Sequence, residues 1–122
     1  MTTVVISSGH GKHIRGASGI LDEVDEARRV VEGIATALRR LGVNAITYHD
    51  DVSTTQDQNL ARIVDFHNSQ VRDLDISVHF NAYVETDQPM GTEVLRRSEA
   101  DPIDAFELSK AIAKAGGFIN RG

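Results

Sequence analysis

Two of the five histidines stand where a catalytic metal could be held. His10 comes just after a short β-branched run, residues 2–6, and His79 follows a second apolar run, residues 74–78. If both runs are parallel strands, both histidines lie at the carboxyl ends of strands, where open α/β sheets bind their ligands. We therefore expect the two imidazoles to converge on one crevice that could bind a metal ion.

A third ligand is expected from the start of the helix that follows the first strand. Residues 21–24 read L-D-E-V and come directly after the glycine-rich segment 16–19. A carboxylate there lies at the same edge of the sheet, and a helix N-terminus favours negative charge. Glu23 is the predicted ligand, with Glu26 and Asp22 as alternatives. On local grounds alone, Glu23 also fits a solvated acid at a helix start, and each histidine fits a hydrogen-bonded structural residue.

The composition narrows the chemistry of such a site. The chain has no cysteine, which excludes a thiolate metal site and a cysteine nucleophile. Two neutral imidazoles and one carboxylate leave a fourth position for water, an arrangement typical of catalytic zinc. Zinc lowers the pKa of that water and polarises a carbonyl group, which favours amide hydrolysis. The sequence therefore predicts a zinc-dependent hydrolase.

The other basic residues are predicted to have less specific roles. His13 is expected in an exposed loop where it could touch substrate, while His49 and His67 are expected to be structural or solvent-facing. The pairs at 28–29 and 39–40 are arginines that the helical period places mostly opposite the apolar stripe, so they are predicted to form a solvated face.

The elements that position these residues alternate along the chain. Strands are predicted at residues 2–8, 43–49, 74–78 and 91–95, and helices at residues 24–41, 55–69 and 102–116, the last capped by Asp101 with Pro102 in its first turn. The residues of this last helix expected to face the core are Ala105, Phe106, Ile112 and Ala113. The order β-α-β-α-β-β-α predicts an α/β fold, a twisted and mostly parallel sheet with helices on both faces.

Length and charge exclude several classes of protein. A chain of 122 residues suits one domain, predicted over residues 1–122. The net charge of −5 argues against nucleic acid as a partner. No apolar run near the N-terminus is long enough for a signal peptide or a membrane span, so we expect a cytoplasmic chain with no membrane partner.

The motifs together resemble one family. S-G-H-G at residues 8–11, Glu23 at the head of the next helix and S-V-H-F-N-A at residues 77–82 resemble the zinc-dependent N-acetylmuramoyl-L-alanine amidases. The similarity is greatest to the catalytic domains of phage and prophage endolysins, which share S-T-T-Q, here at residues 53–56, and N-R-G, here at residues 120–122. The resemblance covers the whole chain.

This resemblance implies a site and a reaction. The family's zinc ligands fall on His10, Glu23 and His79, and Asn81 matches a residue that lines the same cleft and binds substrate. The implied reaction cleaves the amide between N-acetylmuramic acid and the L-alanine of the stem peptide. The implied partner is bacterial peptidoglycan, reached after release from the cytoplasm and with any wall-binding domain lying outside these residues.

One part of the family pattern is missing. In the family a further strand follows N-R-G and carries a general-base glutamate in a segment of the form L-x-E-x-x-F, which these 122 residues do not contain. Glu93 does not match it, so the catalytic glutamate is expected downstream of Gly122, and the domain is expected to be C-terminally incomplete, without its last strand and helix. Two alternatives to an active amidase remain: a catalytically silent zinc- or wall-binding module, and a zinc exopeptidase.

Overall fold

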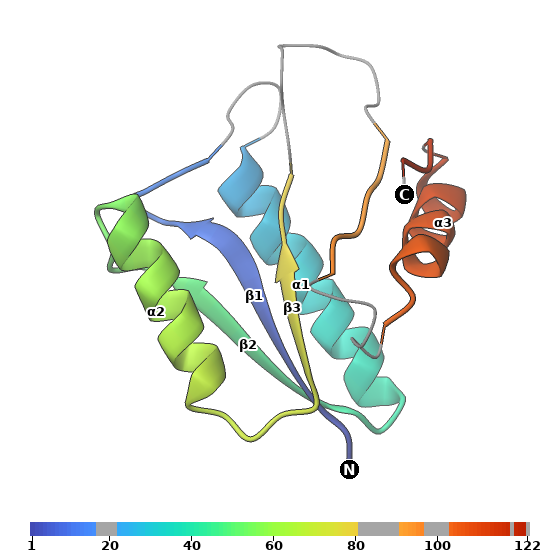
Figure 1. Ribbon diagram of the computed structural model, residues 1–122, viewed down its shortest axis with the longest axis horizontal. Helices are drawn as coiled ribbons and strands as arrows, with labels where there is room; N and C mark the ends of the chain where they lie inside the picture. Colours follow the sequence, from blue (N-terminus) through green and yellow to red (C-terminus); the bar gives the residue numbers. More distant parts are fainter. Residues whose placement is uncertain (17–21, 81–90, 97–102, 118, 122) are drawn as a thin grey trace. The chain divides into compact units, whose positions relative to one another are not determined.

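The computed structural model describes residues 1–16, 22–80, 91–96, 103–117 and 119–121 of an α/β chain (Figure 1). In chain order its elements are β1 (Thr3–Gly11), α1 (Glu23–Arg40), β2 (Asn44–Asp50), α2 (Gln56–Asn68), β3 (Leu74–Val78) and α3 (Ala105–Gly116). The chain divides into two compact units, Met1–Glu85 and Thr86–Gly122, and each is described by itself.

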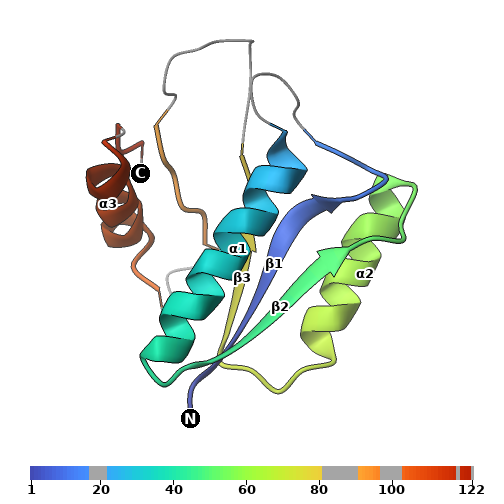
Figure 2. The ribbon, with the colours of Figure 1, turned by 180° about the vertical axis from the view of Figure 1, so that it is seen from behind.

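The first unit is built on a parallel sheet, as the sequence predicts. Its strands lie in the order β2-β1-β3, and β1 pairs in parallel with both neighbours. Figures 1 and 2 show α1 on one face of this sheet and α2 on the other. The central position of β1 brings its carboxyl end, which carries His10, next to the carboxyl end of β3, which precedes His79.

The core of this unit lies between the sheet and α1. Val4 and Ile6 of β1 pack with Val31 and Ala35 of α1 and with Ala45 of β2, and all five side chains are buried. These contacts use the apolar stripe of α1, whose residues recur at steps of three and four. Full burial of a valine or isoleucine side chain contributes about 1.5–3 kcal/mol, so this contact holds α1 firmly on the sheet.

Both helices of this unit begin within one residue of their predicted starts. The Asp22 side chain caps α1 by accepting hydrogen bonds from the backbone N–H groups of Val24 and Asp25. The Thr55 hydroxyl caps α2 by accepting from the N–H of Gln58. The cap at Asp22 places Glu23 in the first turn of α1, at the same edge of the sheet as His10.

In the second unit, the predicted strand at residues 91–95 is wrong. The described residues there form only an isolated parallel bridge between Thr92 and Asn120. Gly91 adopts a φ of 89°, which bends the chain out of extended geometry, and the Thr92 hydroxyl hydrogen-bonds Ser109 of α3. The short run therefore contacts the interior of α3 through Ser109 and does not extend a strand ladder.

The start of α3 also differs from the prediction. Its N-cap is Asp104, whose carboxylate accepts from the N–H of Glu107 at 3.1 Å, while Asp101 and Pro102 lie outside the described residues. Residues 101 and 104 are both aspartates, so the preference of N-caps for Asp does not distinguish the two positions. Of the four residues expected to face the core, Ala113 is buried and Ala105 is half-buried, but Phe106 and Ile112 are 59% and 42% exposed.

No helix in the described part of the chain is long and apolar enough to cross a membrane.

Candidate metal centre

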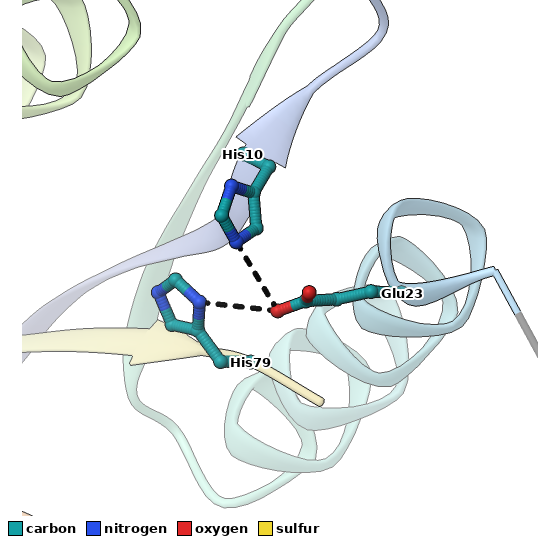
Figure 3. Close-up of side chains that lie close together, drawn as sticks. All are labelled: His10, Glu23 and His79. Carbon is teal, nitrogen blue, oxygen red and sulfur yellow. Dashed lines mark hydrogen bonds and ion pairs between the residues drawn. The ribbon is translucent and has the colours of Figure 1, made fainter. Parts of the chain in front are cut away.

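The three predicted ligands come together at the carboxyl edge of the sheet. His10 Nε2 lies 3.4 Å from Glu23 Oε1, and His79 Nδ1 lies 3.3 Å from the same oxygen (Figure 3). One donor atom from each residue can be chosen so that all three lie within 4.8 Å of one another. The site thus draws one side chain from the end of β1, one from the first turn of α1 and one from the residue after β3.

Two of the three donor separations fit zinc. Two ligands that are each about 2.0–2.1 Å from a tetrahedral zinc ion lie about 3.3 Å from each other. The two separations from Glu23 Oε1, 3.4 and 3.3 Å, agree with this value. The donor set of two imidazoles and one carboxylate is also the set that leaves a coordination position open in catalytic zinc sites.

Exposure of the ligands shows from which side the site is reached. The Glu23 side chain is 4% exposed, whereas His10 is 26% and His79 is 44% exposed. A buried carboxylate needs compensating partners, and Glu23 Oε1 accepts a hydrogen bond from the N–H of Phe80 in addition to facing the two rings. The carboxylate is therefore the inner wall of the site, and the histidines form its solvent-facing rim.

His10 reaches the site through an irregularity in β1. Ser7 pairs with Tyr48 and Gly11 pairs with Asp50, so β1 has two more residues than β2 between these two pairs. Within the bulge His10 has a φ of 59°, the left-handed region that costs a non-glycine residue about 1–2 kcal/mol. The positive φ thus falls on the histidine itself and not on its neighbours Gly9 and Gly11.

The nearby glycines instead provide space for the ligands. A Cβ atom at Gly9 would overlap the imidazole of His79, and one at Gly16 would overlap both His10 and Glu23. A substitution at either position would force a ligand to move.

The two alternative carboxylates do not join the cluster. Asp22 caps α1, and Glu26 is ion-paired with Arg29 on the same helix. The predicted substrate residue Asn81 lies outside the described residues. His13 is exposed in the loop after β1, as predicted.

Arg15 ties that loop to the start of α1. Its guanidinium group hydrogen-bonds both carboxylate oxygens of Asp22, reaches Asp25 at 2.7 Å and donates to the carbonyl oxygen of Lys12 at 3.0 Å. The hydrogen bond from Arg15 is the main cause that lowers the pKa of Asp22. The loop that contains Gly16 is thereby held against the helix that carries Glu23.

The other two histidines belong to structural networks, as the sequence predicts. His49 bonds the Ser8 hydroxyl and Glu32 at 2.8 Å each, on the α1 side of the sheet. His67 bonds the Ser7 hydroxyl at 3.0 Å and Asp75 at 2.7 Å, beside a cavity of about 300 Å³.

The Ser7–His67–Asp75 series has the order of a catalytic triad but not its setting. Ser7 is fully buried in the middle of the central strand, where neighbouring strands pair with it on both sides. Backbone N–H groups committed to a sheet ladder are not available to stabilise an oxyanion. These contacts therefore satisfy buried polar groups and attach α2 to the sheet.

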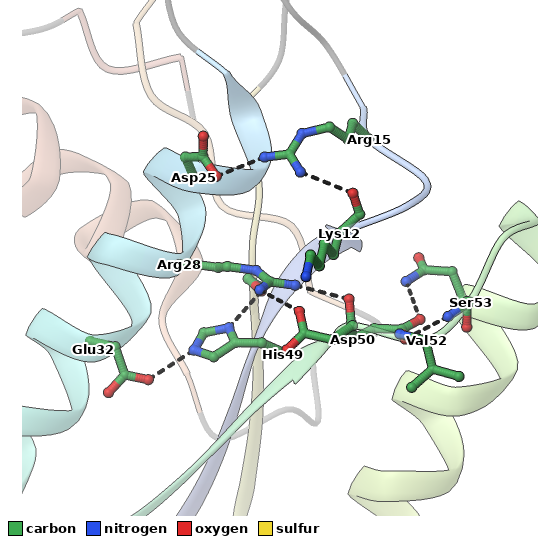
Figure 4. Close-up of polar contacts among 12 residues, drawn as sticks. Lys12, Arg15, Asp25, Arg28, Glu32, His49, Asp50, Val52 and Ser53 are labelled. Atoms are coloured by element: carbon green, nitrogen blue, oxygen red, sulfur yellow. Dashed lines mark hydrogen bonds and ion pairs between the residues drawn. The ribbon is translucent and has the colours of Figure 1, made fainter.

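The roles of Arg28 and Asp50 differ from what the sequence predicts or were not predicted from it. Arg28 was predicted on a solvated face, but its side chain is only 24% exposed and donates to Asp51 at 2.6 Å and to the carbonyl oxygen of Asp50 at 2.9 Å (Figure 4). Burial raises the pKa of the Asp50 carboxyl, but hydrogen bonds from Ser53, Val52 and Asn59 outweigh it and hold that pKa at about 2. The D-D-V-S sequence at residues 50–53 was a usable signal, since Asp at the end of a strand often accepts from N–H groups two or three residues ahead.

Comparison with known proteins identifies the family of the chain. The family model of N-acetylmuramoyl-L-alanine amidases matches residues 4–119, nearly the whole chain, and the protein belongs to this family. These are amidases whose substrate is peptidoglycan and which are generally zinc-dependent. A search of curated proteins found no match to this chain.

Proposed function

We propose that this chain is a zinc-dependent amidase that binds its metal through His10, Glu23 and His79. The observation that carries the proposal is the spacing of the donor atoms, 3.4 and 3.3 Å from one carboxylate oxygen, which fits tetrahedral zinc. Family membership supports the same conclusion independently. The bond cleaved is the amide between N-acetylmuramic acid and the L-alanine of the stem peptide.

The residues of the chain have separate roles in this proposal. The two histidines supply neutral nitrogen donors from the exposed rim, and Glu23 supplies the negative charge from the buried wall. Bound zinc supplies Lewis-acid polarisation of the substrate carbonyl and of an attacking water. The peptidoglycan strand approaches from the histidine side, and Asn81 is the proposed substrate-binding residue by its match to the family pattern.

Digestion of purified cell walls tests the reaction. An amidase releases new L-alanine amino termini without new reducing sugars, whereas a glycosidase releases reducing ends without amines. The assay should include Glu23→Gln and the matched control Glu26→Gln, one turn further along α1. We expect Glu23→Gln to abolish the released amines and Glu26→Gln to retain them, and equal release of amines by the two variants, at a measurable rate, would contradict the proposed site.

A second candidate is a zinc-binding module with little hydrolysis. Among the described residues, Glu23 is the only carboxylate in the cluster with His10 and His79, and as a proposed ligand it is not free to act as a general base. A positioned general base typically raises the reaction rate about 10²–10⁴-fold, so its absence favours this candidate. The test compares the 122-residue chain with a version extended through an L-x-E-x-x-F segment. Much faster wall hydrolysis by the extended version supports this candidate, and equal rates exclude it.

The proposed setting is that of a phage or prophage endolysin. The S-T-T-Q and N-R-G segments support this assignment by their resemblance to that group. The proposed partner is the bacterial wall, with any wall-binding domain outside residues 1–122. Isolated walls lysed by the purified protein at the expected bond would support this setting, and cleavage of free peptides alone would favour an exopeptidase.

A further inference from the structure

A single backbone carbonyl links two of the proposed ligands. The carbonyl oxygen of Asp50, at the end of β2, accepts a hydrogen bond from the N–H of Lys12 at 2.8 Å and another from Arg28 Nη2 at 2.9 Å (Figure 4). Lys12 is two residues after His10 in the chain, and Arg28 lies five residues after Glu23 on α1. The segment that carries His10 and the helix that carries Glu23 therefore meet at this one oxygen.

The carbonyl itself is held in place by the turn that follows it. The Asp50 carboxylate accepts from the N–H groups of Val52 and Ser53 at 2.9 and 3.0 Å and from Asn59 Nδ2 of α2 at 2.9 Å. Asp50 is 1% exposed, so water competes little with these bonds. The oxygen is thus a fixed point of the fold rather than a mobile loop atom.

The bulge that presents His10 depends on this fixed point. Its two ends are the pairs Ser7–Tyr48 and Gly11–Asp50, and His10 adopts its left-handed conformation between them. A strained backbone conformation persists only where surrounding contacts determine it. At Gly11 the chain approaches so closely that a Cβ atom would lie 2.8 Å from the Asp50 oxygen. Release of this end would let His10 relax away from Glu23.

We propose that Arg28 is a positioning residue for the metal centre. It fixes α1 to the Asp50 carbonyl and thereby sets the distance between Glu23 and His10. The inference rests on the proposed zinc site. Arg28 is not one of the proposed ligands, and its effect passes through the carbonyl. Its contact with Asp51 is more exposed and is not part of this function.

The test measures zinc affinity rather than hydrolysis. The zinc dissociation constant of the full chain is determined by competition with a chromophoric chelator for wild type, Arg28→Gln, Arg28→Lys and Asp51→Asn. The Co²⁺ absorption spectrum reports the coordination geometry of each protein. Loss of groups that orient metal ligands typically weakens metal binding about 10–100-fold, and we expect Arg28→Gln to fall in the lower part of that range with a changed Co²⁺ spectrum. Asp51→Asn removes only the exposed ion pair and should retain both properties.

Circular dichroism in a chelator checks that each variant folds. Arg28→Lys keeps the positive charge and one donor nitrogen but not the planar fork of the guanidinium group, and it should bind zinc with an affinity between those of wild type and Arg28→Gln. If Arg28→Gln does not fold, Gly11→Ala tests the same carbonyl from the other side and should also weaken zinc binding. Wild-type zinc affinity in a folded Arg28→Gln or Gly11→Ala variant overturns the inference. Absence of zinc binding by the wild type would instead contradict the proposed function.

Discussion

The turn after β2 allows the effect of one buried carboxyl group on stability to be predicted. The pKa of Asp50 is about 2 in the folded chain against an ordinary value of 3.8, because the N–H groups of Val52 and Ser53 and the Asn59 side chain donate to it. At 1.36 kcal/mol per pH unit, this gap corresponds to about 2 kcal/mol. Because the folded pKa is the lower one, the stabilisation is complete at neutral pH and is lost as the pH falls through 3.8 toward 2.

The substitution Asp50→Asn should remove this contribution. The asparagine oxygen can still accept from the two backbone N–H groups, but its amide nitrogen would face the donor nitrogen of Asn59, which now donates to Asp50 at 2.9 Å. We expect a loss of about 2 kcal/mol in the free energy of unfolding at pH 7, in the range measured for hydrogen bonds to charged groups. From the two pKa values, the wild type should lose about 1 kcal/mol through Asp50 between pH 7 and pH 3, and the variant should not.

Urea unfolding in the presence of a chelator measures this difference. The free energy of unfolding is determined at pH 7 and pH 3 for wild type, Asp50→Asn and the exposed control Asp51→Asn. The pKa values of Asp22, Asp51 and Asp75 are also lowered in the fold, but these residues are present in both wild type and Asp50→Asn, so their effect cancels in that comparison. If Asp50→Asn loses as much stability between pH 7 and pH 3 as the wild type, the reasoning about this turn is refuted.

Three further substitutions have distinct expected outcomes. Gly9→Ala should weaken zinc binding by about tenfold or more in chelator competition, because its Cβ overlaps the ring of His79, and an unchanged affinity would show that the ring has room to move. Gly33→Ala on α1 is its control: with no atom within 4 Å of the new Cβ, it should leave zinc affinity unchanged and raise the free energy of unfolding by about 0.4–1 kcal/mol. Ser7→Ala deprives His67 of a buried partner and should destabilise the chain by about 1–3 kcal/mol in urea unfolding while zinc affinity is retained; lost zinc binding in a folded variant would connect that network to the site.

Much of the site could be predicted because it follows from local patterns and one rule of topology. The apolar runs before His10 and His79 identify two strands, and the apolar period that begins at Val24 identifies the start of α1. In a parallel sheet the carboxyl ends of strands lie at one edge, so the donor atoms of His10, Glu23 and His79 are expected to meet, and the structure brings them within 4.8 Å.

The features that could not be predicted depend on contacts between distant segments. The helical period places Arg28 on a polar face, but its partner is a backbone carbonyl on β2, which no side-chain pattern reveals. The left-handed φ of His10 results from pairing at both ends of a bulge. The expected strand at residues 91–95 was wrong because short runs acquire strand geometry only from a partner, and Thr92 pairs with a single residue.

Zinc K-edge X-ray absorption of the purified chain, combined with its metal content, tests the central claim most directly. We predict one zinc ion per chain with nitrogen and oxygen ligands at about 2.0–2.2 Å, of which two are imidazoles. His79→Ala should lose the stoichiometric metal, and Glu26→Gln should retain it with an unchanged spectrum. Full zinc occupancy with the same spectrum in His79→Ala would place the metal elsewhere and contradict the account.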